Sequence, residues 1–181
     1  MLKQPKVSLV MGSDSDFPVL ESTIKVLQTF DVKVEVSVCS AHRTPERAAD
    51  LARNAESEGV DVIIAAAGKA AHLPGVLAAF TCLPVIGVPI KSSTMDGMDS
   101  LLSIVQMPAG IPVATVAING SENAALLAVQ IMGGAYPYLR QKMHEYKEKM
   151  ALAVEKKDRE LKERLSAGFS NGLNRDEVKN A

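Results

Sequence analysis

Hydrophobic positions fall into five short runs, separated by longer stretches in which apolar side chains recur with helical spacing. The runs predict buried strands over residues 7–11, 32–38, 60–67, 84–88 and 112–118. The stretches between them predict helices over residues 17–30, 45–58, a short segment from about 74, 100–106 and 122–131. Strands rich in Val, Ile and Ala that alternate with helices are typical of a parallel sheet covered on both faces. The pattern therefore predicts a three-layer α/β/α sandwich with a doubly wound, flavodoxin-like sheet.

The chain changes character after residue 135. Residues 1–135 have the pattern of one α/β domain, whereas residues 136–165 predict an extended, highly charged helix and residues 166–181 a frayed tail. A narrow apolar stripe follows the charged helix, at Leu139, Met143, Tyr146 and Met150. Two interpretations are open: the helix lies across a neighbouring subunit, or it is a solvated terminal helix.

Charge is spread very unevenly along a chain of ordinary composition. Of the 181 residues, 47% are hydrophobic and 23% are charged, and the net charge is −1. This composition excludes a wholly disordered chain and argues against nucleic-acid binding as the main function. Residues 59–139 hold only six charged side chains, whereas residues 140–164 hold fifteen. Because so apolar a segment would leave large apolar surfaces exposed in a monomer, we expect subunit interfaces to bury them and therefore a homo-oligomer.

The predicted location of the protein is the cytoplasm. The N-terminus reaches acidic residues too early for a secretory signal. Two long uncharged stretches, 70–90 and 100–121, are interrupted by prolines, which excludes continuous membrane-spanning helices over them. Cys39 and Cys82 lie in apolar segments, and we predict that both are buried free thiols in a reducing compartment.

Four loops are the natural candidates for a functional site. In open parallel sheets, ligands bind beyond the carboxyl ends of the strands. Polar or glycine-rich loops follow four of the predicted strands, at residues 12–16, 40–45, 68–75 and 89–99. Two of the three histidines, His42 and His72, fall in these loops. The strand ends therefore predict where the chemistry takes place.

The first loop combines small polar residues with a predicted helix start. Gly12, Ser13 and Ser15 precede the helix, and such a turn can seat an anion such as phosphate. The carboxylates of Asp14 and Asp16 would repel a phosphate, so one of them accepts hydrogen bonds from sugar hydroxyls or caps the helix. A purely structural interpretation is also open, with Asp16 as the N-cap residue.

The other loops supply a proton carrier and further anion contacts. Arg43 has the planar guanidinium that suits a phosphate, and His42 can exchange a proton near neutral pH. Gly68 and the small residues near it leave backbone amides open to an anion, and His72 is expected to support this loop. Cys39 could be a thiol nucleophile, but the end of a strand favours a core position.

Several common chemistries lack their sequence motifs. The chain has no Walker loop, no GxGxxG fingerprint, no HExxH motif or other zinc-ligand spacing, and no GxSxG elbow. Asp14-Ser15-Asp16 resembles the start of haloacid-dehalogenase-type phosphatases, which need Mg²⁺ and carboxylates at later strand ends. The third predicted strand leads instead into Ala67 and Gly68, which disfavours that chemistry.

Six motifs occur in order over nearly the whole domain. They are MGSDSD (11–16), SAHRTP (40–45), AAHLPG (70–75), LPVIGVP (83–89), DSLLSIVQMP (99–108) and NAALLA (123–128). Together they resemble the class I N5-carboxyaminoimidazole ribonucleotide mutases of bacterial purine synthesis. The resemblance implies an α/β/α subunit in a homo-octamer with no metal and no organic cofactor. It also implies an ATP-independent transfer of carboxylate from the exocyclic nitrogen of an imidazole to ring carbon C4.

By position, the resemblance implies a role for each residue of the site. His42 would be the general acid/base of the reaction. Ser13 and Arg43 would bind the ribonucleotide phosphate, with Ser40 assisting. Asp16 would hold the ribose hydroxyls. The remaining substrate contacts would come from the loop after the third strand, at Gly68, Lys69, Ala70 and His72.

Lys69 departs from the family pattern. The family usually reads AGGAAHLPG, whereas here Lys69 follows Gly68. If this position needs a positive φ, lysine adds about 1 kcal/mol of strain. If it does not, the ammonium points outward or contacts the anionic substrate. Two alternatives stay open: a class II-type carboxylase that uses CO2 directly, and a nucleotide-binding relative that is inactivated at Lys69.

Overall fold

A five-stranded parallel sheet forms the centre of the protein. The computed structural model describes the backbone of residues 3–173 and the side chains of residues 3–167. The strands are β1 (Lys6–Met11), β2 (Lys33–Val38), β3 (Val62–Gly68), β4 (Val85–Ile90) and β5 (Ala114–Thr115). Their order across the sheet is β2-β1-β3-β4-β5, and all neighbours are parallel. This order confirms the predicted doubly wound, flavodoxin-like sheet.

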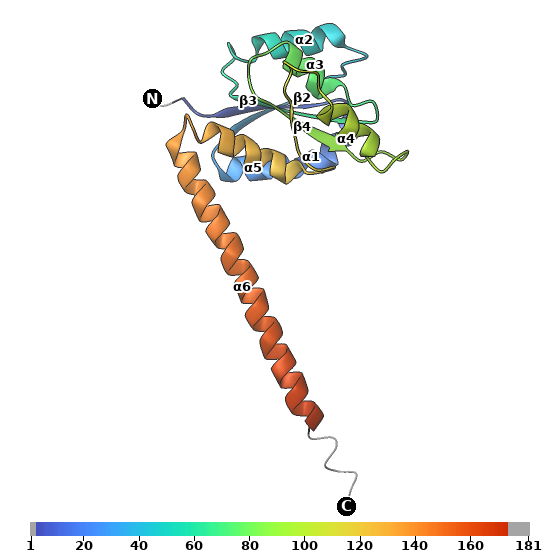
Figure 1. Ribbon diagram of the computed structural model, residues 1–181. Helices are drawn as coiled ribbons and strands as arrows, with labels where there is room; N and C mark the ends of the chain where they lie inside the picture. Colours follow the sequence, from blue (N-terminus) through green and yellow to red (C-terminus); the bar gives the residue numbers. More distant parts are fainter. Residues whose placement is uncertain (1–2, 174–181) are drawn as a thin grey trace, which may run out of the picture. The chain divides into compact units, whose positions relative to one another are not determined.

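Helices cover both faces of the sheet, as predicted. They are α1 (Phe17–Thr29), α2 (Pro45–Asn54), α3 (Leu73–Ala79), α4 (Met98–Val105) and α5 (Ser121–Met132). Helices α1 and α5 pack against each other on one face, and α2 and α3 pack on the other (Figure 1). A Cβ atom at Gly87 of β4 would collide with Ile104 of α4 and approach Pro74 of α3. A glycine here therefore allows both helices to approach the sheet closely.

The three inner strands make up most of the core. Strands β1, β3 and β4 are buried along almost their whole length, because helices cover them on both sides. Leu9, Ile64 and Ile86 have no exposed surface. Strand β2 lies at one edge, where Val36 and Val38 stay 45% exposed within the single chain. Its alternation of Val with polar residues nevertheless predicts this edge strand to within one residue, since a strand was expected over residues 32–38.

The fifth strand is much shorter than predicted. The pattern indicated a strand over residues 112–118, but β5 comprises only Ala114 and Thr115. The carbonyl of Pro89 on β4 accepts the N–H of Asn119 at 2.8 Å. Proline has no N–H to donate back toward the fifth strand, so the ladder cannot continue regularly past Gly87.

Two further expectations about the first domain have mixed outcomes. Asp16 occupies the N-cap position of α1, as predicted, but its side chain makes no capping hydrogen bond, because the residue ends a short 3₁₀ turn (Asp14–Asp16) and has helical dihedral angles. Ser13 caps that turn instead, by accepting the N–H of Ser15 at 3.3 Å. Cys39 is buried as predicted, whereas Cys82 is exposed, in the turn between α3 and β4.

The chain divides into two units, residues 1–140 and 141–181. The final helix α6 (Pro137–Leu173) supplies the described part of the second unit and continues past the predicted end at residue 165. Ion pairs one turn apart, such as Lys162 with Asp158 at 2.7 Å, stabilise the charged part of this helix before residue 165. The rest of the predicted tail, 174–181, lies outside the described residues. Over the described chain, every helix is either too short or too polar to cross a membrane.

Candidate functional site

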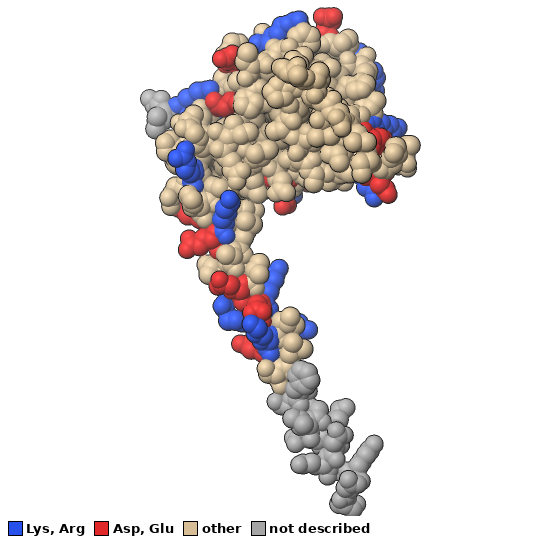
Figure 2. Space-filling model, in the orientation of Figure 1, with Lys and Arg blue, Asp and Glu red and all other residues tan. Residues whose placement is uncertain are grey.

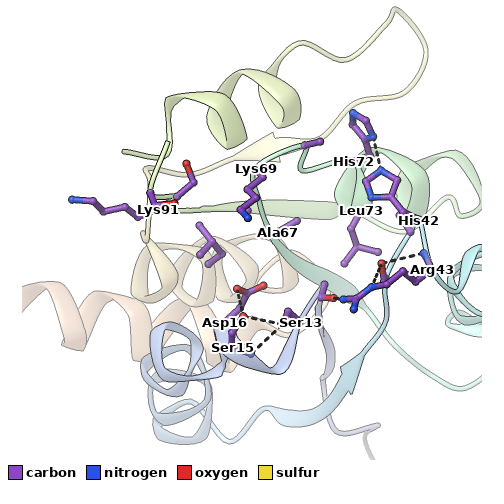
Figure 3. A pocket seen from close by; sticks show the side chains of 18 residues that line it. Ser13, Ser15, Asp16, His42, Arg43, Ala67, Lys69, His72, Leu73 and Lys91 are labelled. Atoms are coloured by element: carbon purple, nitrogen blue, oxygen red, sulfur yellow. Dashed lines mark hydrogen bonds between the residues drawn. The ribbon is translucent and has the colours of Figure 1, made fainter. Parts of the chain in front are cut away.

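A pocket of about 640 Å³ lies at the carboxyl ends of the parallel strands. The loops that follow β1, β2, β3 and β4 line it, so the four loops nominated from the sequence lie around one pocket. The structure brings every predicted site residue to this one pocket, whose side chains Figure 3 shows. These residues are Ser13, Asp16, Ser40, His42, Arg43, Gly68, Lys69, Ala70 and His72.

The loop after β1 presents a chain of hydroxyl groups to the pocket. The N–H of Gly12 donates to the carbonyl of Ala66 on β3 at 3.0 Å, which fixes the start of the loop. The hydroxyl of Ser15 donates to Ser13 Oγ at 2.8 Å, and Ser13 Oγ reaches Asp14 at 3.3 Å. Hydroxyls oriented in this way can bond a ligand oxygen without carrying charge themselves.

Asp16 brings a largely buried carboxyl group to the floor of the pocket. The residue is only 8% exposed, and the Ser15 hydroxyl lies 3.5 Å from the carboxylate. Burial raises the pKa of the Asp16 carboxyl, although the backbone of Ser13 and the Ser15 hydroxyl oppose this shift. A carboxylate in this position can accept further hydrogen bonds from the hydroxyl groups of a ligand.

Replacing Asp16 by Asn is expected to stabilise the free protein at neutral pH. A carboxyl whose pKa is raised on folding favours the folded state only when it is protonated, and this contribution is lost as the pH rises through the folded pKa. Asp16→Asn should therefore raise the melting temperature at pH 7.5, and the gain should shrink as the pH approaches 4. Scanning calorimetry of both proteins at several pH values measures the difference. A gain that does not vary with pH would contradict the assigned cause.

The loop after β2 is locked by its own hydrogen bonds. The Thr44 N–H donates to the Ser40 carbonyl at 2.8 Å, and the Ser40 N–H donates to Thr44 Oγ1 at 3.1 Å. Arg43 Nη2 donates to the carbonyl of Gly12 at 3.4 Å, which links this loop to the first one. Its Nε lies 3.5 Å from Ser40 Oγ, and the remaining N–H donors of the guanidinium can bind an anion.

The side chains of His42 and His72 contact each other from the loops that follow two strands. His42 follows β2 and His72 follows β3, and His42 Nε2 lies 2.8 Å from His72 Nδ1 (Figure 3). The ring planes cross at 79°. Both residues were candidates from sequence, but no sequence pattern indicates that their side chains bond each other.

Lys69 has a strained backbone conformation with a positive φ, the first of the two possibilities considered for a lysine at this glycine position. Its φ is +56°, in the left-handed region that a residue with a Cβ atom rarely occupies. The side chain projects into the pocket in Figure 3, and none of the ion pairs within the described residues involves it. An ammonium in this position adds positive charge to a pocket that already contains Arg43.

The loop after β4 contributes residues that sequence reasoning did not select individually. Lys91, Ser92 and Ser93 line the pocket. The Ser92 hydroxyl donates to both carboxylate oxygens of Asp99, at 2.8 and 2.9 Å. Because ligands bind beyond the carboxyl ends of parallel strands, the sequence nominated residues 89–99 as a segment. A run of common polar residues does not indicate which of them face the ligand.

The pocket differs from the metal site of the phosphatase alternative. Strand β3 ends at Gly68, and Lys69 and Ala70 follow where that chemistry needs a carboxylate. In the described part of the chain, no group of three or more His, Cys, Asp or Glu side chains has an arrangement that could hold a metal ion. The residues of this pocket therefore suit an anionic, hydroxylated ligand better than a divalent cation.

Comparisons with known proteins identify the family. A family model described as AIR carboxylase matches residues 6–153. An N5-carboxyaminoimidazole ribonucleotide mutase of Pyrococcus abyssi is 62% identical over 81% of this chain and 84% of its own length. A protein of the same name from Thermotoga maritima is 51% identical over 96% of this chain and 99% of its own. The crystal structure of Treponema denticola PurE superimposes with a TM-score of 0.79 at 30% identity, covering 88% of this chain and 99% of that one. The resemblance drawn from the six motifs is thereby confirmed, and the chain belongs to the AIR carboxylase family.

Proposed function

We propose that this protein is an N5-carboxyaminoimidazole ribonucleotide mutase of de novo purine biosynthesis. It would convert the N5-carboxy compound into 4-carboxy-5-aminoimidazole ribonucleotide without ATP, metal or organic cofactor. The relatives of that name support the activity, since they match this chain over most of its length. The observation that carries the proposal is the single pocket that gathers an anion-binding arginine, a buried carboxyl and a histidine.

The ribonucleotide would be anchored by its phosphate and ribose. Arg43 and the hydroxyls of Ser13 and Ser40 offer several donors within one corner of the pocket. Asp16 would accept hydrogen bonds from the ribose hydroxyls, which would offset the cost of burying its charge. With both ends of the ribose phosphate held, the imidazole would extend toward the loops that carry His42 and Lys69.

His42 would move one proton in each half of the reaction. In the first half it protonates the exocyclic nitrogen, whose bond to the carboxylate breaks and releases CO2. The electron pair of that bond stays on the nitrogen, which becomes the amine of aminoimidazole ribonucleotide. Ring carbon C4 then attacks CO2, and His42, now neutral, removes the C4 proton to restore aromaticity. The proton that His42 gives up in the first half returns to it in the second, so one imidazole is sufficient.

The loop after β3 would bind the carboxylate that migrates. Gly68, Ala70 and the strained Lys69 line the pocket. The Lys69 ammonium would pair with this carboxylate, while the small neighbours leave room for CO2 beside the ring. Retention of CO2 next to C4 replaces a diffusional encounter by a local one.

Two variants at Lys69 separate its backbone strain from its charge. Lys69→Gly should stabilise the protein by about 1 kcal/mol, because glycine adopts the left-handed conformation without a Cβ clash. Lys69→Ala keeps the strain and should not stabilise. If the ammonium binds substrate, both variants should raise KM about tenfold. Thermal unfolding and steady-state kinetics measure the two effects, and an unchanged KM in both variants would remove Lys69 from the binding site.

We further propose that the active form is a cytoplasmic homo-octamer. The first unit exposes large apolar side chains on β2, α4 and nearby loops, including Val36, Val38, Met95, Met98, Leu102 and Val105. Figure 2 shows that few charged groups interrupt the visible face of this unit. Helix α6 exposes Met150, Val154, Leu161 and Leu165, and it would pack on a neighbouring subunit. Surfaces of this kind are usually covered by a partner.

A direct assay distinguishes the mutase from the alternatives. Purified protein is given the N5-carboxy ribonucleotide, or aminoimidazole ribonucleotide with bicarbonate, each with and without EDTA. Aminoimidazole ribonucleotide with bicarbonate is the appropriate comparison substrate, because the matching family model is described as AIR carboxylase. We expect fast, EDTA-resistant conversion of the N5-carboxy compound. Preference for aminoimidazole ribonucleotide would indicate the direct carboxylase, and binding without turnover would indicate an inactivated relative.

A further inference from the structure

The hydrogen bond between His42 and His72 restricts which nitrogen of His42 can react. His42 Nε2 and His72 Nδ1 are 2.8 Å apart, and their ring centroids are separated by 4.9 Å. A bond between two uncharged imidazoles requires a hydrogen on one nitrogen and a lone pair on the other. Nε2 of His42 is therefore occupied within the protein, and Nδ1 is the nitrogen left to exchange a proton with a ligand in the pocket.

Both rings are held by ordered backbone rather than by chance contact of long side chains. The N–H of His72 donates to Ala70 at 2.9 Å, and the carbonyl of His72 accepts the Val76 N–H at 2.9 Å as α3 begins. The neighbouring Ala71 and Leu73 are buried. The loop of His42 is closed on itself by the bonds between Ser40 and Thr44. The backbone that carries each ring is thus fixed by hydrogen bonds, although both side chains are exposed.

We propose that His72 is a positioning residue for His42. It accepts the Nε2–H of His42 and so leaves Nδ1 of His42 as the reacting atom. This inference rests on the proposed function. It replaces the direct substrate contact expected for His72 by an action through His42. His72 itself neither gains nor loses a proton in the reaction.

The proton that His42 gains and loses determines which ring donates the hydrogen bond between the two histidines. As a base, His42 must present a lone pair on Nδ1, so its Nε2 carries the hydrogen and donates to His72 Nδ1. As an acid, His42 carries hydrogens on both nitrogens, and Nε2–H still donates to the same acceptor. His72 therefore stays in one tautomer, with its own hydrogen on Nε2, through both halves of the reaction.

An uncharged acceptor fits a residue that must act alternately as acid and base. A carboxylate in this position orients an imidazole and also favours its protonated form. None of the hydrogen bonds or ion pairs in the described residues joins a carboxylate to either ring. His72 supplies the orientation without adding a negative charge beside His42.

Two substitutions of His72 differ in whether they keep the acceptor. The side-chain amide of Asn lies as many bonds from the backbone as Nδ1 of histidine, whereas that of Gln lies one bond further. His72→Asn should therefore keep kcat within about threefold of the unmodified protein. His72→Gln should lower kcat about 10- to 100-fold, with KM changed less than threefold. Equal kcat values for His72→Gln and the unmodified protein would overturn the inference, as would equal losses in both variants.

A spectroscopic measurement tests the bond independently of activity. In protein labelled with ¹⁵N-histidine, a scalar coupling across the hydrogen bond should join His42 Nε2 to His72 Nδ1, with the hydrogen on Nε2 of His42. Absence of this coupling at a pH where both rings are neutral, or a hydrogen on His72 Nδ1, would overturn the inference. If the unmodified protein fails to convert the N5-carboxy ribonucleotide, the proposed function fails, while the coupling still decides the role of the pair.

Discussion

His42→Asn is expected to lower kcat by about 10²- to 10⁴-fold while nucleotide binding stays within a few-fold of that of the unmodified protein. Asn keeps a polar side chain of similar size but cannot exchange a proton near neutral pH. The fold should tolerate the change, because His42 is exposed and its loop is fixed by bonds between Ser40 and Thr44. Steady-state kinetics with the N5-carboxy ribonucleotide and calorimetric titration of the product measure the two quantities.

His144→Asn is the matched control for this loss. His144 is also exposed, but it lies on α6 and does not line the pocket. Its replacement should leave kcat unchanged. Equal turnover of the His42→Asn and unmodified proteins would remove His42 from the proposed chemistry, whatever the effect on binding.

Arg43→Ala is expected to weaken ligands that carry a phosphate about 10- to 100-fold, with little effect on the corresponding nucleosides. The guanidinium bonds Gly12 and Ser40 only at 3.4 and 3.5 Å, so the protein makes little use of its donors. Titration of the ribonucleotide and of its dephosphorylated nucleoside, side by side, measures the difference.

Arg47→Ala provides the control for a general change of charge. Arg47 is exposed on α2 and does not line the pocket. Its removal should weaken neither ligand by more than about twofold. If Arg43→Ala weakened nucleotide and nucleoside equally, the phosphate assignment would be wrong.

The sequence predicts the inner sheet and the position of the pocket well, for the same physical reason. Strands β1, β3 and β4 are buried on both faces, so their continuous apolar runs mark the strand positions. In a parallel sheet all carboxyl ends point to one edge, so the loops that follow them must meet there. The pairing of Met11 with both Val38 and Ala66 brings the first three strand ends level.

The sequence pattern does not predict features that depend on tertiary contacts. The carbonyl of Pro89 accepts a hydrogen bond from Asn119, but Pro89 has no N–H to continue the ladder to β5, which an apolar run alone cannot indicate. Cys82 lies in an apolar segment but at a turn, where a short connection holds it at the surface. The bond between His42 and His72 depends on the exact spacing of two loops, and the left-handed conformation of Lys69 becomes visible only with the backbone.

A crystal structure of the His42→Asn variant with the N5-carboxy ribonucleotide bound would decide the mode of action. Because this variant should bind without turning over, the substrate should remain intact in the crystal. We expect the phosphate between Arg43 and Ser13, the ribose hydroxyls on Asp16, and the exocyclic nitrogen and C4 of the ring within about 3.5 Å of the side chain at position 42. A phosphate bound elsewhere, or a ring remote from position 42, would contradict the arrangement proposed for this pocket.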